Sequence, residues 1–209
     1  MSKVDDLLAW LIPRRCVLCH EPSGKLTVCR GCRDDLPWLV KTDPGEGAGA
    51  LAALSYEYPV DRMITAAKFH RKLHFAWALG ELLAEAVVVR RAVVPELLVP
   101  VPLHRRRLAE RGYNQALEIA RPVAERLSMK LATSLCERCK PTAEQTGLSA
   151  AERRSNLLGA FRVRACCPGA HIAILDDVIT TGSTTTALAQ AFHDAGAAGV
   201  QVWAAARTL

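Results

Sequence analysis

The apolar positions of this 209-residue chain alternate between short continuous runs and helical stripes. Runs with the length of a buried strand lie at residues 51–58, 97–101, 170–178 and 199–206. Apolar residues spaced three and four apart, which predict helices, lie at residues 79–87, 117–127 and 187–195. Pro122 falls inside the second helix and is expected to kink or interrupt it. Strands that alternate with helices predict an α/β fold with a doubly wound, mostly parallel sheet.

The first 49 residues have a different organisation. Four apolar residues share one helical face before Pro13 and predict a short amphipathic helix: Leu7, Leu8, Leu11 and Ile12. Residues 41–49, KTDPGEGAG, have the composition of a linker. We therefore expect a small module at 1–40, a linker at 41–49 and the α/β domain at 50–209.

Composition identifies the class of protein and limits its location. Half of the residues are hydrophobic and 23% are charged, as in an ordinary soluble protein. No uncharged apolar stretch approaches the roughly 18 residues of a membrane span, and the N-terminus lacks the features of a secretory signal. These observations predict a cytoplasmic protein. The net charge of +6 suits an anionic ligand such as a phosphate ester or nucleic acid, although such an excess is also common on solvated surfaces.

The eight cysteines fall into two groups. Cys16, Cys19, Cys29 and Cys32 form two C-x2-C pairs separated by nine residues, which predicts a compact four-thiolate Zn²⁺ site. A closed site of this kind has no open position for water, so its role is expected to be structural. The other group could form a second site, but we interpret its members as small apolar side chains: Cys136, Cys139, Cys166 and Cys167.

The most informative segment is residues 172–186, IAILDDVITTGSTTT, where a buried strand leads through two acids into a helix. Asp176 and Asp177 would lie at the carboxyl end of the strand, where carboxylates can bind ribose hydroxyls and help to hold Mg²⁺. The following residues, Thr180, Thr181, Gly182, Ser183 and Thr184, would hold a phosphate at the start of the helix. Gly182 would allow positive φ there. The alternative is an acidic turn followed by a Ser or Thr helix cap.

This segment resembles the phosphoribosyl pyrophosphate (PRPP) signature of type I phosphoribosyltransferases. Residues 97–120 and 140–163 add the pieces PVP, RGYNQA, T-x-x-Q, ER-x-x-N and AF, in that order. With the front cysteines, these pieces make the chain similar to the ComF/GntX family of phosphoribosyltransferase-like proteins. The resemblance implies a type I phosphoribosyltransferase fold, PRPP or a nucleotide as ligand, and Mg²⁺.

The resemblance also implies roles for individual residues. Lys68 lies in KFHRK, at the place of the family's pyrophosphate loop, and Arg105 is a candidate cation beside it. Gln145 and Arg153 match family positions in a segment, 142–153, that corresponds to a loop closing over the site. We expect Arg153 to act with the two aspartates in catalysis. Other basic residues are available for a pyrophosphate group: Arg71, Lys72, Arg106, Arg107 and Arg111. Tyr113 could stack on a base, although a packed tyrosine with a satisfied hydroxyl is commoner.

Two functions remain open at this point. The first is a Mg²⁺-dependent transferase that moves 5-phosphoribose from PRPP to an acceptor that the sequence does not identify. The second is a non-enzymatic adaptor that senses PRPP or a nucleotide, while its zinc module and arginines engage single-stranded DNA or a DNA-uptake partner protein. The family's association with competence and DNA uptake supports a link to DNA in both. The family name also suggests a gluconate-related role, but the sequence contains no residues that we can assign to the recognition of a sugar acid.

Overall fold

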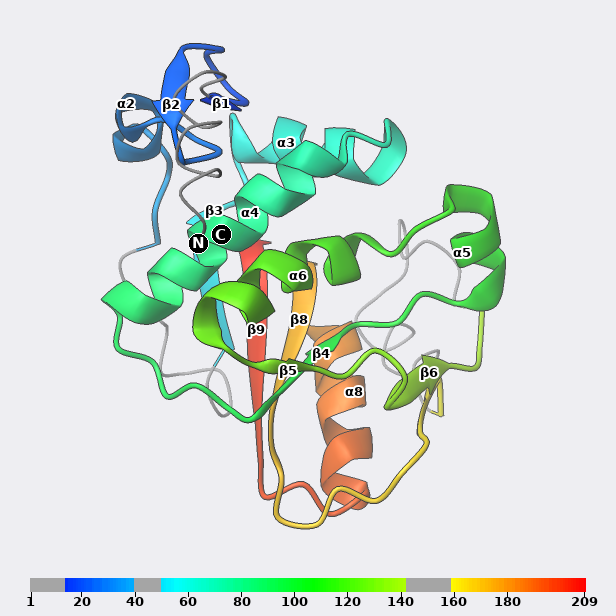
Figure 1. Ribbon diagram of the computed structural model, residues 1–209. Coiled ribbons are helices and arrows are strands. Elements are labelled where there is room, and N and C mark those ends of the chain that lie inside the picture. The colour runs from blue at the N-terminus through cyan, green and yellow to red at the C-terminus, as the bar shows by residue number, and fades with distance from the viewer. Residues whose placement is uncertain (1–13, 40–49, 142–158) are drawn as a thin grey trace, which may run out of the picture.

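The computed structural model describes residues 14–39, 50–141 and 159–209 (Figure 1). Its centre is a five-stranded sheet in the order β3-β9-β8-β4-β5, in which every neighbouring pair is parallel. The strands are β3 (Ala50–Ser55), β4 (Leu97–Pro100), β5 (Lys130–Leu131), β8 (His171–Ile179) and β9 (Gly199–Arg207). The predicted parallel α/β fold is confirmed, and only the two-residue strand β5 was not expected.

Helices cover both faces of this sheet. The helices that follow the strands are α3 (Val60–Phe69), α4 (Leu73–Val89), α6 (Gln115–Leu127) and α8 (Ser183–Asp194). Helices α4 and α6 pack against each other and on the sheet, and α8 packs on β8 and β9 apart from that pair (Figure 1). Residues 172–175 of β8 are all fully buried although successive side chains point to opposite faces. The sheet is therefore doubly wound, as predicted.

Helix α6 continues through Pro122, so the interruption suggested by the sequence does not occur. The reason lies in the neighbouring helix. A Cβ atom at Gly80 of α4 would lie 2.5 Å from Cγ of Pro122 and 2.2 Å from the carbonyl oxygen of Ile119. The missing side chain at Gly80 allows the two helices to approach closely, and burial of this contact stabilises a helix that contains a proline.

The strand order determines where a ligand can bind. After β4 the chain moves outward to β5, whereas after β8 it moves in the opposite direction to β9. The carboxyl ends of β4 and β8 therefore flank the switch point of the sheet, where open α/β sheets bind their ligands. Pro100 of β4 pairs with Leu175 of β8, so Asp176 and Asp177 follow directly beyond this pairing.

The N-terminal module packs on α4. It contains the antiparallel strands β1 (Arg14–Arg15) and β2 (Pro22–Gly24) and helix α2 (Arg30–Asp34). Two acids of α4 hold it: Glu81 accepts a hydrogen bond from the Thr27 N–H at 3.3 Å, and Glu85 pairs with Arg33. The expected helix at residues 7–12 and the linker at 41–49 lie outside the described residues.

Two further elements stand beside the carboxyl edge of the sheet. They are helix α5 (Arg105–Arg111) and an antiparallel hairpin of β6 (Cys136–Arg138) and β7 (Phe161–Val163). A bridge between His104 and Arg138 joins the start of α5 to β6. None of the helices in the described ranges has the length and apolar character needed to cross a membrane.

Candidate functional site

The four front cysteines converge on one point. The Sγ atoms of Cys16, Cys19, Cys29 and Cys32 all lie within 4.8 Å of one another, and those of Cys19 and Cys29 are 3.6 Å apart. A tetrahedral Zn²⁺ with Zn–S bonds of 2.3 Å requires sulfur separations of about 3.8 Å. The thiols therefore fit the metal that the spacing predicts, and a closed four-sulfur shell leaves no position for a reaction.

The electrostatics of this cluster also favour a cation. Burial alone would raise the pKa of Cys16, but hydrogen bonds from the backbone N–H groups of Cys19, Cys29 and Leu18 lower it to about 6. Burial, together with hydrogen bonds to the neighbouring thiols, raises the pKa of Cys32. Thiols this close cannot all ionise unless a positive charge compensates them, and Zn²⁺ would supply that charge.

The second group of cysteines forms no comparable cluster. In the described part of the chain, the front set is the only group of three or more His, Cys, Asp or Glu side chains placed to hold a metal ion. Cys136 and Cys167 are buried, whereas Cys139 and Cys166 are exposed. Burial raises the pKa of Cys136 to about 12, so this thiol stays neutral and packs as a small apolar side chain.

The two aspartates at the end of β8 have different environments. Asp177 is 4% exposed, and its Oδ2 lies 2.7 Å from Nζ of Lys68 at the end of α3. This contact is an ion pair by distance, without the alignment of a hydrogen bond. Oδ1 of Asp177 accepts the N–H of Val178 at 2.8 Å. Asp177 is thus already paired with the predicted pyrophosphate-loop lysine, which joins α3 to the centre of the sheet.

Asp176 has no comparable ion pair among the contacts of the described residues. Its Oδ1 accepts the N–H of Asp177 at 2.9 Å, and its side chain is partly accessible. Burial, followed by the negative charge of Asp177, raises the pKa of Asp176 to about 7. The charge of Lys68 opposes this effect only in part. Asp176 is therefore the carboxyl whose ionised form would gain most from a hydroxyl donor or a cation.

The loop after β8 has the predicted backbone conformation. Gly182 is the N-cap of α8 and has a φ of 70°, so the expected positive φ is confirmed. The alternative of a Ser or Thr cap is wrong, because Ser183 and Thr184 belong to the first turn of the helix. Oγ1 of Thr181 lies 2.8 Å from Oγ of Ser183, and the Thr185 hydroxyl donates to the Gly182 carbonyl at 2.9 Å. Exposed Thr180 and Thr181 complete a turn rich in hydroxyl groups beside the helix N-terminus.

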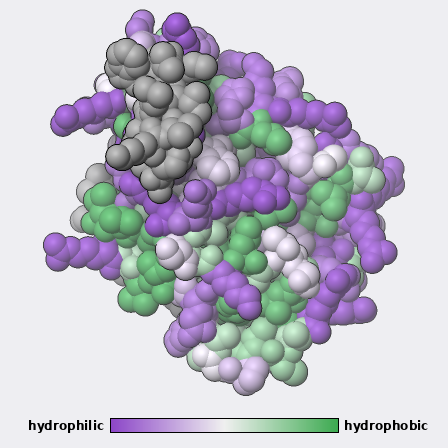
Figure 2. Space-filling model, in the orientation of Figure 1, coloured by the Kyte–Doolittle hydropathy of each residue, from purple (hydrophilic) through white to green (hydrophobic). Residues whose placement is uncertain are grey.

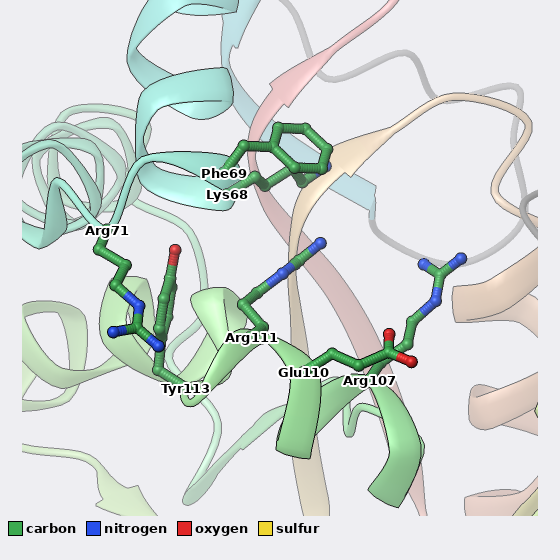
Figure 3. A pocket seen from close by; sticks show the side chains of 7 residues that line it. All are labelled: Lys68, Phe69, Arg71, Arg107, Glu110, Arg111 and Tyr113. Carbon is green, nitrogen blue, oxygen red and sulfur yellow. The ribbon is translucent and has the colours of Figure 1, made fainter.

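Lys68 also lines a cationic pocket (Figure 3). Its volume is about 330 Å³, and it is lined by Lys68, Phe69, Arg71, Arg107, Glu110, Arg111 and Tyr113. Arg107, Glu110 and Arg111 come from α5 and face the end of α3 across the pocket. Lys68 both lines the pocket and pairs with Asp177, so this side chain links the pocket to the acid pair.

Only some of the basic residues that the sequence suggested as ligand-binding candidates line this pocket. Arg105 does not line the pocket; it is exposed, and its charge contributes to lowering the pKa of Glu137 on β6. Arg107 and Arg111 line the pocket in its place. These two residues are four apart and therefore share one face of α5, a signal that could have identified them once α5 was recognised as a helix. The predicted residues Gln145 and Arg153 lie outside the described residues.

Residues of the RGYNQA motif hold the elements around the site in place through hydrogen bonds. The Tyr113 hydroxyl donates to the Ala67 carbonyl, next to Lys68, so this tyrosine is packed and satisfied. Asn114 caps α6 by accepting the Ala116 N–H at 3.1 Å and donates to the Val101 carbonyl at 3.0 Å, beyond β4. The motif therefore fixes the end of α3, the end of β4 and the start of α6 relative to one another.

Comparisons with known proteins agree with the zinc module and identify relatives. Residues 7–44 match the double zinc ribbon domain family. DNA utilization protein YhgH of Escherichia coli O157:H7 is 40% identical over 226 residues, which cover 95% of this chain and 99% of the relative. The protein of the same name from Salmonella typhi is 36% identical, with 93% and 84% covered. Competence protein F of Haemophilus influenzae is 35% identical, with 92% and 90% covered.

Solved structures with a similar arrangement are more distant. One is a glutamine PRPP amidotransferase from B. subtilis complexed with ADP and GMP, with 20% sequence identity and a TM-score of 0.41. The match covers 61% of this chain and 25% of the amidotransferase, so the chain spans about a quarter of that protein. Another is an asparagine mutant from a study of an invariant aspartic acid in HPRTs, with 12% identity, a TM-score of 0.40, and 63% and 74% covered.

Proposed function

The chain belongs to the ComF/GntX family, and from this membership together with the geometry of the site we propose that it binds PRPP and transfers its 5-phosphoribosyl group to an acceptor. The observation that carries the proposal is the position of Lys68. Its Nζ is 2.7 Å from Asp177 at the switch point of the sheet, and its side chain also lines the cationic pocket. A ligand bound here would meet carboxylates on one side and guanidinium groups on the other.

Each part of PRPP has a chemically matched surface in this proposal. The carboxylate of Asp176 would accept hydrogen bonds from the ribose hydroxyls. The backbone amides of residues 181–184, at the start of α8, would hold the 5-phosphate where the helix dipole favours an anion. The pyrophosphate would lie in the pocket beside Lys68, Arg107 and Arg111.

Transfer breaks the bond between the anomeric carbon and pyrophosphate, and the acceptor forms the new bond to that carbon. Negative charge develops on the leaving oxygen as the bond breaks, so fixed cations in the pocket stabilise the transition state more than the ground state. Mg²⁺, when bound, would supply further positive charge to the pyrophosphate. The Asp176 carboxyl, with its pKa near 7, and the hydroxyl groups of residues 180–184 fit a divalent ion accompanied by a ribose phosphate. Gln145 and Arg153, which lie in the sequence between β6 and β7, would also contact the ligand.

Calorimetry tests ligand binding directly. The wild-type protein titrated with PRPP and Mg²⁺ should release heat and bind one equivalent, and Lys68→Ala should weaken binding at least tenfold. Lys72→Ala is the matched control, because Lys72 is exposed and does not line the pocket. Absence of binding to the wild-type protein, or equal effects of the two substitutions, would refute the proposed site.

Pyrophosphate release tests the transfer step. The assay offers a panel of nucleobases and small amines as acceptors and uses Asp176→Asn as the inactive control. Release that depends on one acceptor supports the transferase. Tight PRPP binding without turnover with any acceptor would instead support the non-enzymatic sensor.

The names of the relatives support a role connected with DNA. Proteins named for DNA utilization and competence are 35–40% identical to this chain over more than nine tenths of its length. We therefore propose that the PRPP site functions in the use of external DNA, whether it acts as a transferase or as a sensor. Loss of growth on DNA in a Lys68→Ala strain, with normal growth of a Lys72→Ala strain, is the expected result.

A further inference from the structure

A surface of arginines lies beside the cationic pocket and is not used by the proposed transfer. Arg162 and Arg164 of β7 pair with Glu137 of β6 at 3.7 and 2.7 Å. The charge of Arg105, at the start of α5, acts on the same carboxylate. Three guanidinium groups thus surround one acid, which leaves an excess of two positive charges. We call Arg105, Arg162 and Arg164 the arginine surface.

The members of this surface are accessible to a large ligand. The side chains of Arg162 and Arg164 are 71% and 50% exposed. Hydrophilic side chains gather along the right-hand edge of the molecule, the side on which α5 and β6 lie (Figure 2). Exposed ion pairs of this kind contribute little to stability. The excess positive charge at this exposed position would attract an anionic ligand.

Helix α5 connects the arginine surface to the pocket. The bridge between His104 and Arg138 places the first residue of α5, Arg105, beside the hairpin. The same helix turns Arg107 and Arg111 into the pocket. An extended anion lying on the hairpin would therefore reach the pocket along one short helix.

The pocket itself fits the end of such a chain. About 330 Å³ accommodates a terminal phosphate with part of its nucleoside, and is far too small for a duplex. Phe69 is 62% exposed at its mouth, with the Arg111 guanidinium 5.5 Å from the ring centre. An exposed aromatic ring beside arginines is the combination that binds single-stranded nucleic acid, because the ring stacks on a base while guanidinium groups contact phosphates.

We propose that the arginine surface binds the backbone of a single-stranded nucleic acid and directs its phosphorylated end into the pocket lined by Lys68 and Arg111. The proposal uses the same pocket as the proposed PRPP site and therefore predicts competition between the two ligands. In this proposal the arginine surface binds the phosphates along the strand, and the pocket binds its terminal phosphate.

Fluorescence anisotropy with 12-nucleotide oligo-dT separates these two assignments. Three forms are compared: a 5′-phosphate, a 3′-phosphate and no terminal phosphate, each labelled at the opposite or an internal position. The wild-type protein should prefer one phosphorylated form at least fivefold, and PRPP should abolish that preference. Lys68→Ala should abolish the preference while retaining the weaker binding of the unphosphorylated form.

The double variant Arg162→Gln, Arg164→Gln tests the arginine surface. It should weaken binding of all three forms at least tenfold and reduce the slope of log affinity against log salt by about 1.4, since each single-strand phosphate contact contributes about 0.7. The matched control is Arg121→Gln, Arg126→Gln, which removes two exposed arginines from α6 and should change neither quantity. Thermal unfolding verifies that both double variants are folded.

Specific outcomes would overturn the proposal. Equal oligonucleotide binding by the Arg162→Gln, Arg164→Gln variant and its control would refute the role of the arginine surface. An unchanged preference for the phosphorylated end in Lys68→Ala would refute the role of the pocket. Displacement of oligo-dT by polyglutamate at equal charge concentration would indicate an acidic protein partner instead. PRPP binding without oligonucleotide binding refutes only this inference. Oligonucleotide binding with the expected terminal preference but without PRPP binding refutes the proposed PRPP site and the competition that depends on it, and leaves the two binding surfaces for the strand intact.

Discussion

Replacement of Asp176 by Asn is expected to stabilise the free protein at pH 8 while it removes ligand binding. Burial and the neighbouring charge of Asp177 raise the pKa of Asp176 from its ordinary value of 3.8 to about 7. Ionisation of this carboxyl is therefore less favourable in the folded chain than in the unfolded chain. Asn accepts the same hydrogen bond from the Asp177 N–H but carries no charge.

The sign and size of the effect follow from linkage. The folded state binds a proton more tightly than the unfolded state, so the contribution of Asp176 to stability is complete below pH 4 and is lost as the pH rises to about 7. A tenfold difference in a proton equilibrium corresponds to about 1.4 kcal/mol. The change from 3.8 to about 7 thus corresponds to about 4 kcal/mol, an upper value because the side chain is partly accessible to water.

Urea unfolding at pH 5 and pH 8, with no added Mg²⁺, measures this difference. The free energy of unfolding of Asp176→Asn, relative to that of the wild type, should rise between pH 5 and pH 8 by up to about 2.6 kcal/mol, since the rest of the roughly 4 kcal/mol is already lost below pH 5. The zinc module is common to both proteins, so its own pH dependence cancels. Asp177→Asn is the contrasting variant: it removes the partner of Lys68 and should destabilise the protein at both pH values. An Asp176→Asn variant with the same stability relative to wild type at pH 5 and pH 8 would refute the reasoning.

Three further predictions concern packing and the zinc module. Gly80→Ala places a Cβ 2.2 Å from a backbone oxygen of α6 and should destabilise the protein by about 2–3 kcal/mol in urea unfolding. Gly31→Ala, where the Cβ meets open space, should cost less than 1 kcal/mol, and similar losses for the two would contradict the close helix contact. Cys32→Ser should reduce the zinc content, measured with a chromogenic chelator after denaturation, from one ion per chain to a small fraction; full retention would exclude the four-thiolate site. Glu85→Gln breaks the pair with Arg33 and should increase amide hydrogen exchange in residues 14–39 without changing the zinc content, and unaltered exchange would show that other contacts hold the module on α4.

Local sequence determined the parts of this protein that depend on a few consecutive residues. A continuous apolar run can only be buried on both faces, so the strand before Asp176 and its central place in a parallel sheet were predictable. The positive φ of Gly182 follows from the same short segment, as does the convergence of cysteines spaced as C-x2-C pairs. The ComF/GntX resemblance was readable for the same reason, because its motifs are short and ordered.

Tertiary structure decided everything that depends on contacts between distant segments. Asp176 and Asp177 are identical residues in the sequence. In the folded protein Lys68 of α3 pairs with Asp177, whereas burial and the charge of Asp177 raise the pKa of Asp176. Pro122 reads as a helix breaker until Gly80 of another helix packs against it. Likewise, Arg105 and Arg107 belong to one basic run, and the orientation of α5 sends the first to the hairpin and the second into the pocket. Backbone preferences act over a few residues, whereas burial and charge act through space, so the site's electrostatics emerge only when the sheet brings its ends together.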